Sequence, residues 1–175
     1  MKYEKNKTHY VVVTGILVKN GKYLIAKRAS WEKAFPGQWT VPGGKLEVLD
    51  YALKQKDTGS HWYNVLENLL KREIKEEVGL SIKNIGYVTS LVYIRSDEIP
   101  CLIISLFAEL GEEEIKLCDA LTEYKWVDIG EAKDYGLIEG IYEELVILDD
   151  FLKKRSSGDM GDNMEWKRSE ENNNI

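Results

Sequence analysis

The sequence contains few of the residues that build disulfide frameworks and zinc sites. It has two cysteines, Cys101 and Cys118, and two histidines among 175 residues. The cysteines are far apart and form neither a Cys-x-x-Cys pair nor a cluster with the histidines, which excludes a recognisable zinc site or redox motif. Free thiols in a reducing cytoplasm are therefore expected.

Long apolar runs and an excess of positive charge are also lacking. No segment approaches the ~18 apolar residues of a membrane span, and the polar N-terminus lacks the apolar core of a signal peptide. With 24 basic and 30 acidic residues the net charge is −6, which argues against binding a nucleic-acid polymer through clustered Lys and Arg. We therefore expect a cytoplasmic protein that binds neither nucleic acid nor membrane. An acidic pocket can bind a small phosphorylated ligand if divalent cations lie between the carboxylates and the phosphate.

Length and composition favour a single folded domain. A chain of 175 residues that is 43% hydrophobic is long enough for one well-packed core and too short for two ordinary domains. After Arg155 the composition shifts to Ser, Gly, Asp, Asn and Glu, which is typical of disordered chain. The expectation is a domain over residues 1–155 and a disordered tail over residues 156–175.

Apolar, β-branched segments predict five strands, over residues 9–18, 22–28, 85–94, 99–110 and 122–127. Asn20-Gly21 is a strong signal for a two-residue hairpin between the first two strands. An amphipathic helix is predicted over residues 138–152. Residues 48–64 show no clear pattern, so we expect an extended loop or a short helical cover there.

The most informative stretch is Arg72-Glu73-Ile74-Lys75-Glu76-Glu77-Val78-Gly79-Leu80. In a helix Glu73, Glu76 and Glu77 share one face, because they are three and four residues apart. Gly79 fits the position just past the helix end, where a left-handed backbone is cheap for glycine. An apolar ridge beside the carboxylates is formed by Leu66, Leu70, Ile74 and Val78. For an isolated motif of this kind, a charged and solvated helix face is the usual interpretation.

Three earlier segments carry groups suited to a phosphorylated ligand. Lys27-Arg28 ends a predicted strand, and these two cations are either ordinary surface charge or contacts to a phosphate. The Trp39 ring either packs on the core or stacks on a base. Pro42-Gly43-Gly44 permits close approach of the main chain to a ligand, although alone it predicts no more than a turn.

Taken together, these segments resemble the Nudix box, G-x5-E-x7-R-E-U-x-E-E-x-G-U, in which U is aliphatic. Every fixed position from Arg72 onward matches, and Gly44 matches the first glycine. Gly44 and Arg72 are 28 residues apart, whereas the motif separates them by 14, so an insertion of 14 residues splits the box. Counted forward from Gly44, the first acid of the box is Asp50; counted back from Arg72, the position is Asn64. In the family this acid ties the loop to the helix, and which residue does so here is open.

The resemblance implies an α/β fold, an α/β/α sandwich with a mixed β-sheet between helices. It also implies a Mg²⁺-dependent enzyme, with Mn²⁺ as a substitute, that cleaves phosphoric anhydride bonds in a nucleoside diphosphate linked to another group. The first expectation is cleavage of a nucleoside triphosphate to a monophosphate and pyrophosphate. Arg72 would orient the neighbouring carboxylates, and the metal ligands would be the Gly44 carbonyl with Glu73, Glu76 and Glu77.

The resemblance also suggests residues outside the helix. Substrate contacts are expected from Arg28, Trp39, Gly43 and Lys45. Hydrolysis needs a group that takes a proton from water. Glu76 or Glu77 can do so from within the box; outside it Glu123 is the first candidate and Asp119 the second.

Other functions stay open on the sequence alone. The same fold could hydrolyse a nucleotide sugar, ADP-ribose or a dinucleoside polyphosphate, or act as a non-catalytic nucleotide-sensing domain. The carboxylate helix could also be structural, in a protein that serves as an interaction module. Many members of the family are dimers, so a homodimer is a further open alternative.

Overall fold

The computed structural model describes residues 7–110 and 114–157. In chain order its elements are β1 (Tyr10–Lys19), β2 (Lys22–Arg28), β3 (Trp39–Thr40), β4 (Gly43–Lys45), the 3-10 helix η2 (Val48–Asp50), α1 (Val65–Val78), β5 (Ile82–Ile94), β6 (Pro100–Leu110), β7 (Leu121–Val127), α2 (Ile129–Ala132) and α3 (Ile141–Ser156). Most of the tail expected over residues 156–175 lies outside the described residues, and α3 includes Ser156. No helix in the described part of the chain is long and apolar enough to cross a membrane.

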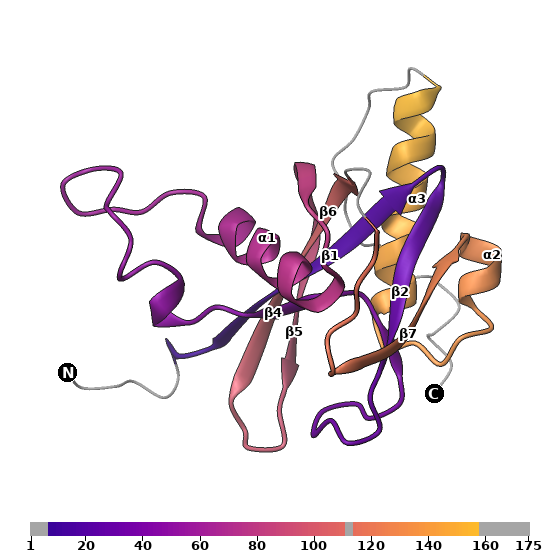
Figure 1. Ribbon diagram of the computed structural model, residues 1–175, viewed down its shortest axis with the longest axis horizontal. Coiled ribbons are helices and arrows are strands. Elements are labelled where there is room, and N and C mark those ends of the chain that lie inside the picture. The colour runs from indigo at the N-terminus through magenta and orange to yellow at the C-terminus, as the bar shows by residue number, and fades with distance from the viewer. Residues whose placement is uncertain (1–6, 111–113, 158–175) are drawn as a thin grey trace.

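The strands form one mixed sheet in the order β3-β2-β1-β6-β5, with β4 paired to β1 and β7 paired to β2 (Figure 1). β1 and β6 run parallel, whereas β1–β2, β2–β7 and β5–β6 are antiparallel. The mixed sheet expected from the sequence is therefore confirmed.

The hairpin between β1 and β2 forms at the predicted turn. Val18 pairs with Tyr23 and Lys19 with Lys22, which leaves Asn20 and Gly21 as the two turn residues. Their φ angles are 52° and 72°, as a type I′ turn requires at both central positions. The hairpin fixes the register of β2, so that Arg28 lies at its far end.

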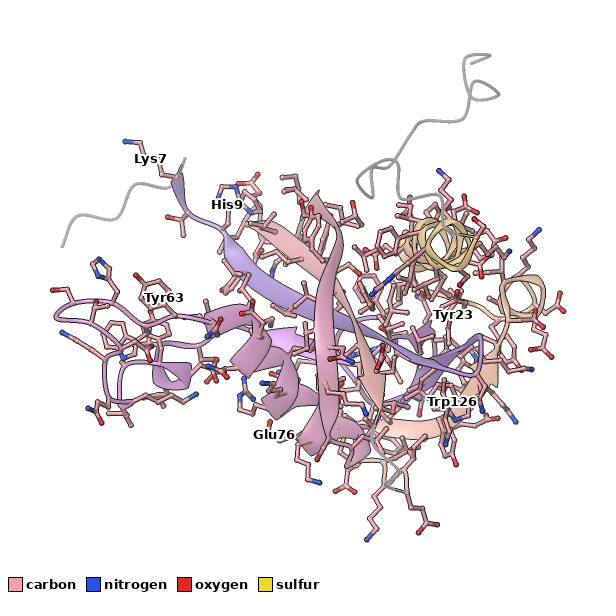
Figure 2. The ribbon with its side chains drawn as sticks, turned by 90° about the horizontal axis from the view of Figure 1, so that it is seen from above. Lys7, His9, Tyr23, Tyr63, Glu76 and Trp126 are labelled. Carbon is pink, nitrogen blue, oxygen red and sulfur yellow. The ribbon has the colours of Figure 1, made fainter. Side chains whose placement is uncertain are left out.

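Two apolar layers cover opposite faces of the sheet. One contains buried residues of α1 packed on Val13, Leu17 and Leu24. The other contains buried residues of α3 packed on Ile16 and Ile25. Seen from above in Figure 2, the strands lie between α1 and α3. This is the expected α/β/α sandwich.

Helix α1 is built from the apolar positions that its sequence predicts. Leu70, Ile74 and Val78 are fully buried, as is Leu69. The helix ends at Gly79, whose φ of 75° is left-handed, and the Lys75 ammonium donates a hydrogen bond to the Gly79 carbonyl at 3.0 Å. Burial of the apolar side fixes the rotation of the helix, and this sets the direction of its carboxylates.

Two short strands were missed by the sequence pattern. Trp39–Thr40 pairs with β2, and Gly43–Lys45 pairs with β1, where a loop and a turn were expected. Strands of two and three residues are too short to show a periodic pattern, and whether they form depends on pairing with strands distant in the sequence. The register sets Gly44 opposite Val13 and Gly43 opposite Thr14, so both glycines are fixed parts of the sheet.

The insertion within the box forms a loop that projects from the domain (Figure 1). It follows the short helix η2 and contains no further helix before α1, so of the two expectations for residues 48–64 the extended loop is the one observed. The Trp62 ring packs 5.4 Å from the Tyr51 ring, centroid to centroid, and the Trp62 indole N–H donates to the Lys54 carbonyl at 3.0 Å. The insertion therefore carries packing contacts of its own.

Candidate active site

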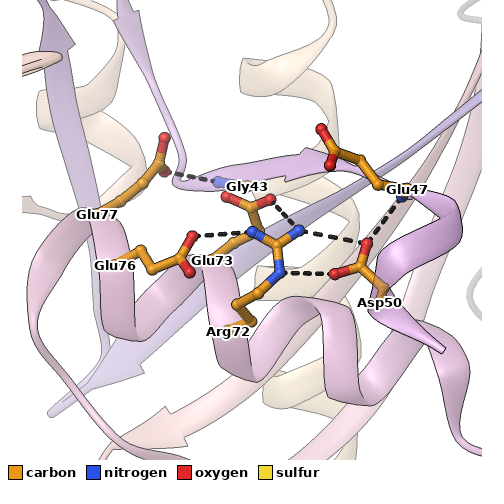
Figure 3. Close-up of polar contacts among 7 residues, drawn as sticks. All are labelled: Gly43, Glu47, Asp50, Arg72, Glu73, Glu76 and Glu77. Carbon is orange, nitrogen blue, oxygen red and sulfur yellow. Dashed lines mark hydrogen bonds and ion pairs between the residues drawn. The ribbon is translucent and has the colours of Figure 1, made fainter. Parts of the chain in front are cut away.

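The site is centred on contacts between α1 and the glycines of β4 (Figure 3). The Gly43 N–H donates a hydrogen bond to Oε2 of Glu77 at 2.9 Å. The Glu73 carboxylate lies directly against Gly44, where an added Cβ would collide with it. A Cβ on Gly43 would collide with the Val13 carbonyl. Gly43 therefore requires glycine for backbone packing, whereas at Gly44 a Cβ would displace only the Glu73 carboxylate.

The Arg72 guanidinium joins three carboxylates in one cluster (Figure 3). Its Nε lies 2.7 Å from Oδ1 of Asp50, Nη2 lies 2.9 Å from Oε1 of Glu73, and Nη1 lies 2.8 Å from Oε2 of Glu76. Burial opposes the charged guanidinium, but the hydrogen bond to Asp50 and the charges of Glu73 and Glu76 outweigh it, so the pKa of Arg72 is raised. Arg72 stays positive throughout the working pH range and orients its acidic neighbours.

Partial burial makes two of the helix carboxylates costly to ionise. Burial raises the pKa of Glu77 to about 7, and the nearby Glu73 charge adds to this, although the Gly43 N–H and Arg28 oppose it. Burial also raises the pKa of Glu73, while Arg72 lowers it. When both Glu73 and Glu77 are ionised, they repel each other and are poorly solvated, so a bound cation would lower the free energy of the pair.

Comparison with known proteins identifies the family. A family model described as the NUDIX domain matches residues 9–145. The chain belongs to the NUDIX domain family. An Enterobacter protein named nucleoside triphosphatase NudI is 37% identical over 68 residues, which are 39% of this chain and 38% of that protein. The NudI of Klebsiella pneumoniae is 24% identical over 136 residues, 72% of this chain and 86% of that protein.

The solved structures support the fold. A MutT NUDIX hydrolase from Burkholderia pseudomallei superimposes with a TM-score of 0.61 at 19% identity, covering 80% of this chain and 98% of that one. At this identity the likeness concerns the fold alone.

In NUDIX terms, the first acid of the box is Asp50. It bonds to Arg72 across the insertion, while Asn64 instead precedes α1 with a left-handed φ of 53°. Asp50 thus ties the loop to the helix, which is the role the sequence left open. Burial opposes the ionised form of Asp50, but the hydrogen bond from the Glu47 N–H and the ion pair with Arg72 outweigh it, so the pKa of Asp50 is lowered.

The expected metal ligands are only partly assembled. Over residues 7–110 and 114–157, no three acidic, His or Cys side chains converge closely enough to hold a metal ion. Glu73 lies against Gly44 and Glu77 accepts a hydrogen bond from Gly43, both in β4. Glu76, whose side chain is 58% exposed, is instead paired with Arg72. The ligand set of Gly44, Glu73, Glu76 and Glu77 stays a prediction, and it requires Glu76 to turn away from Arg72.

Arg28 lies close to Glu77 of the box, but its guanidinium is bonded to residues of the loop that follows β2. Its Nη2 is 2.9 Å from Oε2 of Glu32, and its Nε donates to the Ala34 carbonyl at 2.8 Å. The charges of Arg28 and Glu32 both reach Glu77, where Arg28 lowers the pKa and Glu32 raises it. Glu32 is a site residue that the sequence did not reveal, because no periodic pattern in residues 30–38 gives its direction.

The other expected substrate contacts lie in different surroundings. Trp39 is 8% exposed and packs edge-on against Tyr135 at 4.9 Å, so its ring is part of the core beside α3. Lys45 is exposed on β4, with Nζ 5.6 Å from the Tyr10 ring centroid. Arg95 lies 4.5 Å from the same centroid and was not anticipated. Direct contact of Trp39, Gly43 or Lys45 with substrate stays a prediction.

The two outside carboxylates, Glu123 and Asp119, lie in different surroundings, and the role of either as proton acceptor stays a prediction. Glu123 pairs in register with Lys27, so it faces the α3 side of the sheet, away from the α1 layer that contains Ala26. Its carboxylate forms an ion pair with Lys125 at 3.2 Å. Asp119 instead follows Cys118, whose N–H donates to the Glu77 carbonyl at 2.9 Å.

Proposed function

We propose that this NUDIX protein is a divalent-cation-dependent hydrolase of phosphoric anhydride bonds in nucleotides. Its first expected substrate is a nucleoside triphosphate, which it cleaves to a monophosphate and pyrophosphate. The observation that carries the proposal is that the Glu73 carboxylate contacts Gly44 while the Glu77 carboxylate accepts a hydrogen bond from the Gly43 N–H. The NudI relatives are named nucleoside triphosphatases, which supports the substrate class.

The donor set suits a hard cation such as Mg²⁺, with Mn²⁺ as a substitute. Carboxylate and carbonyl oxygens are the ligands Mg²⁺ prefers, and Mg²⁺ commonly bridges a few carboxylates to substrate phosphates. Glu73 and Glu77, with the Gly44 carbonyl, would hold the cation, and Glu76 would join them on leaving Arg72. When bound, the cation supplies neutralisation of phosphate charge.

The chain's own residues then bind the substrate and move the proton. Arg28 contacts a phosphate as a planar two-pronged donor. A water oxygen bonds to phosphorus, and the bridging bond between the α- and β-phosphates breaks. The water proton passes to a carboxylate, for which Glu76 and Glu77 are the candidates within the box and Glu123 and Asp119 the candidates outside it.

A substrate panel tests the proposal. Nucleoside triphosphates, nucleotide sugars, ADP-ribose and dinucleoside polyphosphates are incubated with Mg²⁺ or Mn²⁺, and released phosphate and pyrophosphate are measured. The expected result is turnover of a triphosphate with release of pyrophosphate, lost in the Glu76→Gln, Glu77→Gln double variant. Raised thermal stability with a nucleotide, but no turnover of any substrate, would instead assign a nucleotide-sensing domain.

A cytoplasmic location and a homodimer both stay predictions. The described part of the chain offers no membrane-spanning helix. Gel filtration at several protein concentrations would measure the oligomeric state.

A further inference from the structure

Arg28 and Glu32 form an ion pair close enough to Glu77 for both charges to act on its carboxylate. The nitrogen-to-oxygen distance is 2.9 Å, and the side chains are 20% and 30% exposed, respectively. A second hydrogen bond, to the Ala34 carbonyl at 2.8 Å, holds the same guanidinium. The loop after β2 thus occupies two donor positions of the Arg28 guanidinium, the group proposed above to contact a substrate phosphate.

A carboxylate and a phosphate oxygen compete for the same guanidinium donors. Both accept two-pronged, charge-assisted hydrogen bonds from arginine, and two anions cannot share one side of the guanidinium without repulsion. The position is crowded with negative charge, because the Glu32 and Glu77 charges already act on each other. A polyphosphate that binds the Nη2 donor of Arg28 must therefore displace Glu32.

We propose that Glu32 occupies the phosphate position of Arg28 in the free protein and must leave when the substrate binds. Glu32 is then a positioning residue that sets substrate affinity and acts through Arg28. Because the chemical step follows after Glu32 has left, its removal changes KM and leaves kcat nearly constant. This inference rests on the proposed function, since it needs Arg28 to bind a substrate phosphate.

The test is the Glu32→Gln variant, which keeps the size and removes the charge. With a nucleoside triphosphate and Mg²⁺, KM is expected to fall about three- to fivefold, the effect of removing one partly exposed ion pair, while kcat changes less than about twofold. Glu131→Gln is the matched control: it breaks the Lys22–Glu131 pair, also 2.9 Å long, which lies at the β1–β2 turn and the start of α2, and it should leave KM unchanged.

Two kinetic results would overturn the proposal. A higher KM in Glu32→Gln would mean that Glu32 orients Arg28 for the substrate, and an unchanged KM would mean that the pair is only structural. A titration with inorganic pyrophosphate, followed by calorimetry, needs no turnover. Tighter binding to Glu32→Gln than to the parent protein supports the competition, and equal binding rejects it. If the parent protein turns over no nucleotide, the proposed enzymatic function fails, and this titration still decides the competition at Arg28.

Discussion

Asp50 and Arg72 form a two-pronged ion pair across the insertion, with Oδ1 2.7 Å from Nε and Oδ2 3.3 Å from Nη2. The Asp50 side chain is 10% exposed, so water screens this pair less than it screens most surface pairs. Aspartate is one methylene shorter than the glutamate of the motif. The short helix η2 compensates, because it brings the Asp50 backbone next to α1, and the Glu47 N–H braces the carboxylate at 2.8 Å.

We predict that Asp50→Ala lowers the free energy of unfolding by about 2 kcal/mol, the usual cost of losing hydrogen bonds to a charged partner. Turnover should fall at least tenfold, because Arg72 loses the contact that fixes it beside Glu73 and Glu76. Denaturant unfolding and steady-state kinetics measure the two effects. Asp97→Ala breaks the exposed two-pronged pair with Arg95 and is the control, with no change in unfolding. Equal effects of both variants would show that the Asp50 pair has no special role.

Local signals accounted for the parts of the molecule that sequence analysis predicted correctly. The Asn20-Gly21 turn and the Gly79 helix end depend on backbone angles that few residues adopt, so the residue type reveals them. The spacing of its apolar residues likewise predicted helix α1. The parallel pairing of β1 with β6 and the short strands β3 and β4 depend on partners distant in the sequence, which no local pattern specifies.

The outside carboxylates show the same limit within the site. Glu123 is the first outside candidate because of the family resemblance, but strand register decides which face its side chain takes, and register is a tertiary property. Asp119 and Glu32 lie in irregular segments whose direction is set by hydrogen bonds from Cys118 and Arg28. The sequence showed that acids were present, and the fold determined that Glu32 lies close enough to act on Glu77.

Gly44→Ala should disable the site with little loss of stability. The new methyl group would meet the Glu73 carboxylate, a flexible side-chain end that can move aside. Moving this carboxylate by about 1 Å is expected to lower kcat/KM about a hundredfold. Gly59→Ala is the control, since a Cβ added there would have nothing within 4 Å of it. A Gly44→Ala variant with normal activity would show that the position of Glu73 does not matter for the reaction.

Trp62→Ala should loosen the insertion and leave the domain intact. The contacts of Trp62 with Tyr51, Lys54 and Lys56 all lie within the projecting loop. Trypsin is expected to cut after Lys54 or Lys56 faster in this variant, while the thermal midpoint shifts by less than about 2 °C. Trp31→Ala, at a site that is 68% exposed, should change neither quantity. A large fall in the midpoint of Trp62→Ala would mean that the loop packing supports the whole domain.

The buried Glu144 should make the protein less stable as the pH rises. Its side chain lies between α3 and β6, where Ser105 donates a hydrogen bond to it at 3.0 Å, and it is 4% exposed. Burial raises its pKa from 4.5 to about 7, so between these values the folded state binds more protons than the unfolded state. The free energy of unfolding therefore falls as the pH rises through this window, and the contribution is fully lost above about pH 7.

Glu144→Gln removes this ionisation and keeps a polar partner for Ser105. At pH 8, without divalent cations, the variant should exceed the parent protein in free energy of unfolding by at most about 3 kcal/mol, the rise in pKa converted at 1.36 kcal/mol per pKa unit. At pH 4 both forms carry a neutral side chain, and the difference should disappear. Urea unfolding across the pH range measures it, with the exposed Glu139→Gln as control. A constant difference between the two pH values would mean that ionisation of Glu144 is not its cause.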